Sequence, residues 1–154
     1  MEPDPTLRIE RATRGHVAQW AQMRAALWPS SPTDKHAAEI AAILADEDGR
    51  LAGFLAIDED RRAVGFAEAS LRHNYVNGCS SSPVLFLEGI YVEPDRRLSG
   101  VARLLCAAVE DFGRQRGVSE FASDARADNK ASHAMHEALG FRETERVVFF
   151  RKVL

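Results

Sequence analysis

The sequence is poor in cysteine and lacks the spacings that cysteine needs to bind a metal or to form a redox pair. It contains two cysteines, Cys79 in a polar loop and Cys106 in a predicted helix. Neither belongs to a CxxC motif, and neither has paired histidines beside it. We interpret both as free thiols of a reducing compartment, and we expect no metal site.

Long apolar segments are also absent. No apolar run approaches the roughly 18 residues that a membrane-spanning helix needs. The first ten residues, MEPDPTLRIE, carry acids and prolines where a signal peptide needs basic and then apolar residues. We therefore expect a cytoplasmic protein that does not contact the membrane.

Positive charge is too scarce to suggest a nucleic-acid partner. Lysine and arginine number 20 against 23 acidic residues, so the formal net charge is −3 and a cationic partner is the easier prediction. The sequence also lacks the GxxxxGK[ST] and GxGxxG signatures of two common nucleotide-binding folds. With 154 residues, 45% of them hydrophobic, the chain is predicted to form one globular domain over residues 1–154.

The periodicity of apolar residues predicts a mixed α/β fold with the element order βααβββαβαββ. A mostly antiparallel sheet with helices on both faces fits this order, because helices alternate with strands only in its middle part. The expected strands are 6–13, 51–58, 63–72, 84–94, 119–125, 141–145 and 146–154, and the expected helices are 14–27, 35–45, 99–117 and 130–140.

The stretch RLSGVA, residues 97–102, lies between the predicted central strand and the helix that follows it. The first turn of a helix leaves backbone N–H groups without partners and carries partial positive charge, so an anion is stabilised there. Gly100 and Ala102 leave room for a pyrophosphate to approach the backbone, and Arg96 or Arg97 adds charge. A simple structural turn explains these six residues equally well.

The wider context resembles the GCN5-related N-acetyltransferases. EGIYVEPDRRLSGVARLL, followed by a short strand and NKASHAMHEALGF, is similar to that family's acetyl-CoA-binding core, and Arg97, Gly100 and Ala102 match its pyrophosphate motif. The resemblance implies splayed fourth and fifth strands with the thioester between them. It implies cofactor contacts from Ile90, Tyr91, Val92, Arg97, Leu98, Ser99, Gly100, Val101, Ala102, Arg103 and Asn129. Many relatives have a tyrosine as general acid where this sequence has His136.

A nearer resemblance is to the aminoglycoside 6'-N-acetyltransferases of the dimeric subgroup. It rests on WPSSP, ASLRHNYVNGCSSSPVLFLEGIYV, ASDA and GFRETERVVFFRK. It implies an aminoglycoside substrate and a homodimer with the C-terminal strands at, or exchanged across, the interface. It also implies that Trp28 and Tyr75 complete the substrate pocket, although Trp28 could equally belong to the core.

The acidic residues agree with a polycationic substrate. Glu88 in the central strand, Asp124 after the next strand and Glu145 near the C-terminus can all face one cleft and attract ammonium groups. Each also has a structural explanation: Glu88 as an acid paired with an arginine, Asp124 as a turn residue and Glu145 as a solvated charge.

We expect direct acetyl transfer with both substrates bound. Glu88, with Asp124 through water, would accept the ammonium proton, His136 is the candidate acid, and a backbone N–H near Tyr91 or Val92 would polarise the thioester. Neither Cys79 nor Cys106 has a base at an evident position to support an acyl-enzyme. Two other functions remain open: acetylation of another small polyamine, an amino acid or a peptide amine, and a non-catalytic acyl-CoA-binding module.

Overall fold

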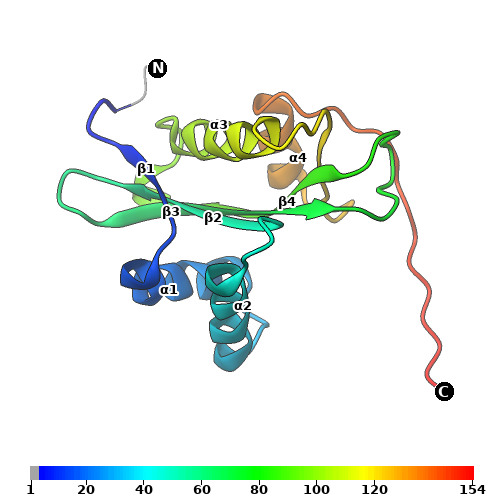
Figure 1. The fold of residues 1–154 in the computed structure, drawn as a ribbon, viewed down its shortest axis with the longest axis horizontal. Coiled ribbons are helices and arrows are strands. Elements are labelled where there is room, and N and C mark those ends of the chain that lie inside the picture. The colour runs from blue at the N-terminus through cyan, green and yellow to red at the C-terminus, as the bar shows by residue number, and fades with distance from the viewer. Residues whose placement is uncertain (1–3) are drawn as a thin grey trace.

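The computed structural model describes residues 4–154, which form a sheet between two layers of helices (Figure 1). Each expected element from the first strand to the last helix is present, with ends shifted by a few residues. In chain order the elements are β1 (Arg8–Arg11), the 3-10 helix η1 (Arg14–His16), α1 (Val17–Leu27), α2 (Thr33–Ala45), β2 (Leu51–Ile57), β3 (Ala63–Arg72), β4 (Val84–Val92), the 3-10 helix η2 (Pro94–Arg96), α3 (Val101–Arg114), β5 (Phe121–Ser123) and α4 (Lys130–Ala138).

The five strands form one sheet in the order β1-β2-β3-β4-β5, so neighbours in the sequence are neighbours in space. The first four strands pair antiparallel, whereas β5 runs parallel to β4 after the crossover through α3. The predicted mixed and mostly antiparallel sheet is confirmed.

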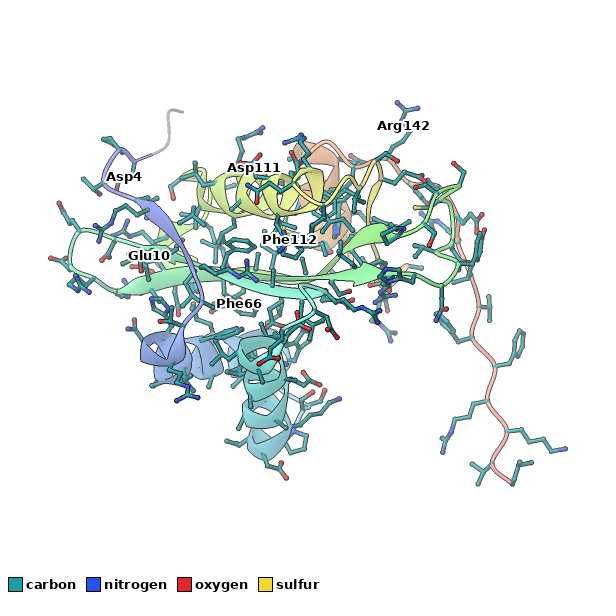
Figure 2. The ribbon with its side chains drawn as sticks, in the orientation of Figure 1. Asp4, Glu10, Phe66, Asp111, Phe112 and Arg142 are labelled. Atoms are coloured by element: carbon teal, nitrogen blue, oxygen red, sulfur yellow. The ribbon has the colours of Figure 1, made fainter. Side chains whose placement is uncertain are left out.

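The two faces of the sheet bury separate cores. Helices α3 and α4 cover one face, and α1 and α2 cover the other (Figure 1). Figure 2 shows Phe112 between α3 and the sheet, and Phe66 on the opposite side toward α1 and α2. Gly113 lets α3 lie close to the sheet, because a Cβ there would come within 2.7 Å of Leu85. The face of α3 predicted from apolar spacing, which includes Val101, Leu105, Val109 and Phe112, is buried.

Local signals set the helix ends as expected. The Asn129 side chain accepts a hydrogen bond from the Ser132 N–H at 3.1 Å and caps α4. Gly117 and Gly140 follow α3 and α4 with positive φ angles of 73° and 93°, a conformation that glycine adopts at low cost.

The two strands predicted at 141–145 and 146–154 are not formed. Phe141 packs on Phe121, with ring centroids 4.8 Å apart, and residues 142–154 then leave the body as an extended segment, the C-terminal arm (Figure 1). The arm is rich in the β-branched and aromatic residues of a strand but pairs with no strand of the described chain, and an extended segment needs such a partner for its backbone hydrogen bonds.

A membrane-spanning helix is not found among residues 4–154, where every helix is too short or too polar to cross a bilayer.

Candidate active site

A cleft opens where β4 and β5 separate. The two strands pair only from Leu85 to Leu87 on β4, opposite 121–123, although β4 continues to Val92. The cleft measures about 180 Å³, smaller than typical ligand pockets, so it can enclose the reacting ends of two molecules rather than either whole molecule. Its lining residues are Leu27, Trp28, Leu87, Glu88, Gly89, Ile90, Ser123, Asp124, Ala125, Asn129, Ser132, Met135 and His136.

Glu88 reaches this cleft from a β-bulge. Ala69 pairs with Leu87 and Glu68 pairs with Gly89, so Glu88 is the extra residue of β4 and has no partner on β3. A bulge bends a strand and turns a side chain away from its regular direction. Strand periodicity cannot show such a bulge, because the register against β3 is a tertiary feature.

The Glu88 carboxylate is held by two residues of β3. The Ser70 hydroxyl donates to Oε1 at 2.5 Å, and the Arg72 guanidinium donates to Oε1 from Nε and Nη2 at 3.1 and 2.9 Å and to Oε2 from Nη2 at 2.8 Å. Arg72 also lies over the Phe86 ring, 3.4 Å from its centroid. The arginine pairing that was one explanation of Glu88 is therefore present, but at the cleft and with an exposed carboxylate.

Trp28 forms the side of the cleft opposite β5. Its ring packs edge-on against Phe66 at 6.0 Å and stacks on His36 at 6.4 Å between centroids. Gly89 makes this position possible, because a Cβ there would lie 2.5 Å from two carbons of the Trp28 ring. Trp28 thus belongs both to the core of α1 and α2 and to the cleft.

A buried ionic network that was not predicted from the sequence lies against Trp28. Arg24 donates to Glu68 and Glu39, and the Trp20 Nε1–H donates to Glu68 at 2.8 Å. Arg24 lies 4.7 Å from the centre of the Trp28 ring. Burial raises the pKa of the Glu68 carboxyl despite the adjacent guanidinium. One sequence feature could have indicated this network. Arg24 is a charged residue at a position of α1 whose spacing from Trp20 and Leu27 predicts a core residue.

His136 and Ser123 meet on the β5 side of the cleft. The His136 Nε2 lies 2.8 Å from the Ser123 hydroxyl, and its Nδ1 lies 2.7 Å from the Ser132 carbonyl oxygen. Phe141 packs edge-on against the imidazole at 5.3 Å. Asp124 follows Ser123 directly and lines the same cleft. The structure therefore brings Trp28, Glu88, Asp124, Asn129 and His136 together as the sequence predicts.

The loop between β4 and α3 is the candidate anion-binding loop. Leu98 has a φ of 61° and Gly100 a φ of 87°, and α3 begins at the next residue. Left-handed residues at a helix start make successive backbone N–H groups converge, which is the geometry of an anion site. Of the two candidate arginines, Arg96 donates from Nη2 to the Asp58 carboxylate at 2.9 Å. Arg97 donates from Nε to the Val92 carbonyl oxygen at 2.9 Å, and this bond does not use its terminal nitrogens.

One edge of β4 is open between the cleft and this loop. Ile90, Tyr91 and Val92 pair with β3 on one side but have no β5 partner on the other. Backbone groups at such an edge can pair with an extended ligand as they would with a strand.

Tyr75 and Glu145 do not line the cleft. Tyr75 is 75% exposed on loop 73–83, and Glu145 is exposed on the C-terminal arm. The Glu120 carboxylate fixes the loop by accepting from the Ser80 and Ser81 N–H groups at 2.9 and 2.7 Å. The expected roles of Tyr75 and Glu145 stay predictions.

Among residues 4–154, no group of three or more histidine, cysteine, aspartate or glutamate side chains is arranged to hold a metal ion. The cleft presents two carboxyl groups, an imidazole and two serine hydroxyls, from Glu88, Asp124, His136, Ser123 and Ser132.

Comparison with known proteins gives the family and several relatives of high identity. Residues 17–141 match the Acetyltransferase (GNAT) family. The chain is 50% identical over 144 residues to an aminoglycoside N(6')-acetyltransferase type 1 of Salmonella typhimurium, covering 94% of this chain and 97% of the relative. It is 51% identical over 150 residues to the enzyme of the same name from Stenotrophomonas maltophilia, covering 97% and 94%.

Solved structures agree with these relatives. AAC(6')-Iy in complex with the bisubstrate analogue CoA-S-monomethyl-acetylneamine is 47% identical, with a TM-score of 0.90 over 96% of this chain and 99% of that one. The AAC(6')-IG enzyme from Acinetobacter haemolyticus, solved without ligand, is 44% identical with the same TM-score, over 96% and 99%.

Proposed function

This chain belongs to the Acetyltransferase (GNAT) family, and we propose that it transfers the acetyl group of acetyl-CoA to the 6'-amino group of aminoglycosides. The observation that carries this conclusion is the likeness, over nearly the full length of both chains, to AAC(6')-Iy bound to an analogue that joins CoA to acetylneamine. Acetylation of that amine would make the protein an antibiotic-resistance enzyme.

The acetyl-CoA site extends from the anion-binding loop along β4 to the cleft. The pyrophosphate lies on the backbone N–H groups at the start of α3, where the helix dipole and Arg97 stabilise its charge. The pantetheine arm pairs with the open edge of β4 and brings the thioester to the point where β4 and β5 separate. The contacting residues in this proposal are Ile90, Tyr91, Val92, Arg97, Leu98, Ser99, Gly100, Val101, Ala102, Arg103 and Asn129.

The aminoglycoside approaches from the acidic side of the cleft. Glu88 and Asp124 attract the ammonium group that is to be acetylated, and the Trp28 ring limits where the sugar can lie. Tyr75 and Glu145 contact parts of the substrate that project beyond the cleft. The ion pair between Arg72 and Glu88 supports the placement of Tyr75. Arg72 is the last residue of β3, and the loop that carries Tyr75 begins directly after it.

The reaction proceeds by direct transfer between two bound substrates. The ammonium loses its proton to Glu88, or to Asp124 and water, and the neutral amine attacks the thioester carbon. Oε2 of Glu88 accepts one hydrogen bond in the protein whereas Oε1 accepts three, so Oε2 is the oxygen with room for an ammonium. A backbone N–H of the open edge of β4 polarises the carbonyl oxygen.

A thiol-release assay tests this function. Purified enzyme, acetyl-CoA and either kanamycin, tobramycin, spermidine or a peptide amine are compared, with an aminoglycoside that has a hydroxyl at C6' as the matched control. We expect turnover with the 6'-amino compounds and none with the 6'-hydroxyl compound. Preference for spermidine or peptide would indicate another amine acetyltransferase, and CoA binding without any thiol release would indicate a binding module.

We further infer that the enzyme is a homodimer held by its C-terminal arms. The arm exposes a concentration of large apolar side chains that a monomer would leave in water. The sheet ends at β5, so an outer strand edge is available to an arm from a second copy of the chain. The exposed apolar residues of the arm are Val147, Val148, Phe149, Phe150, Val153 and Leu154. The free thiols of Cys79 and Cys106 agree with the reducing cytoplasm as its location.

A further inference from the structure

The orientation of the His136 imidazole is determined by its hydrogen bonds. A carbonyl oxygen only accepts, so the Nδ1 that lies 2.7 Å from the Ser132 carbonyl must carry a hydrogen. In the neutral ring Nε2 is then without hydrogen and accepts from the Ser123 hydroxyl at 2.8 Å. In the protonated ring the Nε2–H donates to Ser123 instead, and the serine hydrogen is released to point elsewhere.

Ser123 is the residue at which the two central strands part. It is the last residue of β5, it pairs with Leu87, and both Ser123 and His136 line the cleft. The other acceptor within reach of the Ser123 hydroxyl is the Leu87 carbonyl oxygen, at 3.4 Å. The hydrogen bond with His136, at 2.8 Å, is the shorter of the two. The edge-on packing of Phe141 against the imidazole holds His136 in position beside Ser123.

We propose that Ser123 is the catalytic acid of this enzyme and that His136 acts through it as the source of the proton. This rests on the proposed acetyl transfer, because the group that needs a proton is the thiolate that leaves acetyl-CoA. His136 does not itself have to reach the sulfur, because Ser123 lies between the imidazole and the point where β4 and β5 part.

The proton and electron balance of the step is as follows. The neutral amine nitrogen forms a bond to the thioester carbon, and the C–S bond then breaks with its electron pair going to sulfur. The nitrogen, which is positively charged after the attack, gives its extra proton to solvent water and becomes the amide. The Ser123 hydroxyl gives its proton to the sulfur while it takes a proton from Nε2 of protonated His136. The imidazole is left neutral, with Nδ1–H still bonded to Ser132, and solvent returns the proton before the next turnover.

Because the relay needs a protonated imidazole, kcat should decline at high pH as His136 loses its proton. The cleft contains two other titratable groups among the described residues, the carboxyl groups of Glu88 on β4 and Asp124 after β5. On α4 itself the titratable and charged groups are Lys130, His133 and Glu137. On α3, Arg103 donates to the Ala138 carbonyl at 3.2 Å.

The test compares Ser123→Ala, Ser123→Thr and His136→Gln, with Ser119→Ala as the control that removes an exposed hydroxyl from the same segment. For Ser123→Ala we expect kcat to fall about 100-fold or more, with each KM within about 3-fold of the parent value. Ser123→Thr keeps a hydroxyl and should recover most of the rate. His136→Gln should lose rate and also the decline of kcat at high pH.

A spectroscopic measurement makes the proposal testable without turnover. The ¹⁵N shifts of the neutral imidazole, assigned by comparison with His136→Gln, should show hydrogen on Nδ1, and the Nε2 shift should move in Ser123→Ala. A neutral ring with hydrogen on Nε2 would overturn the relay, as would Ser123→Ala with kcat within 3-fold of the parent. A parent enzyme that turns over spermidine but no aminoglycoside would refute the proposed substrate alone, because the leaving thiolate is the same.

Discussion

The Arg72 guanidinium binds both carboxylate oxygens of Glu88, with Nη2 2.9 Å from Oε1 and 2.8 Å from Oε2. The two residues are on neighbouring strands and meet because Glu88 occupies the bulge of β4. An arginine in this position has two consequences. It holds the Glu88 carboxylate at the cleft, and it leaves Oε2, which accepts one hydrogen bond, as the oxygen that can meet an ammonium.

Replacing Arg72 with methionine should therefore impair catalysis rather than cofactor binding. The methionine keeps an apolar side chain over Phe86 but frees the Glu88 carboxylate, and a misplaced catalytic group costs on the order of 10- to 100-fold in rate. Steady-state kinetics should show this loss in kcat with the KM of acetyl-CoA unchanged. Arg114→Ala, which breaks an exposed pair with Glu110 on α3, should behave as the parent enzyme. Parent kinetics in Arg72→Met would contradict a role for the pair.

Gly100→Ala should weaken acetyl-CoA binding about 10-fold or more. A side chain at a φ of 87° costs roughly 1–2 kcal/mol, and the strain is relieved by turning the backbone N–H groups away from the pyrophosphate. Gly117→Ala is the matched control, because its φ is 73° at the other end of α3 and an added Cβ would contact nothing within 4 Å. Calorimetric titration with CoA should separate the two variants, and equal affinities would refute the anion site.

Gly89→Ala should raise the KM for the aminoglycoside at least several-fold. The new methyl group would displace the Trp28 ring and narrow the cleft, at a stability cost of about 1–3 kcal/mol. Gly53→Ala creates a similar collision with Trp20, at 2.9 Å, away from the cleft. Urea unfolding should show a loss of stability in both variants, whereas the change in KM should be confined to Gly89→Ala. A similar KM change in both would mean that destabilisation alone explains it.

Neither cysteine should carry the acetyl group. Burial and the neighbouring Glu110 raise the pKa of Cys106 to about 12, so only about one molecule in 10⁴ is thiolate at pH 8. Burial also raises the pKa of Cys79, beside Glu120. Iodoacetamide at pH 8 should modify the partly exposed Cys79 first and Cys106 only on unfolding or at much higher pH. A turnover-competent acetyl-cysteine seen by mass spectrometry would refute direct transfer.

Polar substitutions in the arm should dissociate the dimer. Phe149→Asp combined with Phe150→Asp removes the largest exposed apolar groups of the arm, so light scattering at micromolar concentration should report a monomer. Arg151→Asn combined with Lys152→Asn changes polar residues of the same arm and should leave a dimer. A monomeric parent protein would refute the dimer directly.

Several features of this protein could be predicted from sequence because their causes are local. The order of elements follows from apolar periodicity, which survives in any packing arrangement. The turn between β4 and α3 follows from Gly100 at a predicted strand-to-helix junction, and its role as the acetyl-CoA loop stays a prediction that the family resemblance implies. The Asn129 cap and the glycines after α3 and α4 are similarly local.

The predicted C-terminal strands show where such reasoning stops. Residues 146–154 have the composition of a strand, but composition does not supply a pairing partner. Within the described chain the arm pairs with no other strand. Strand formation there depends on another surface, which periodicity cannot specify.

The sequence by itself thus determined the fold class and the ends of the helices, because these depend on apolar periodicity and on residues near one another in the chain. Only the tertiary structure decided which side chains meet. The bulge at Glu88, the contact of Gly89 with Trp28 and the pairing of Ser123 with His136 all depend on strand register and on helix position. A shift of one residue in that register would turn the strand side chains of Glu88 and Ser123 to the opposite face of the sheet, away from the cleft and, for Ser123, away from His136.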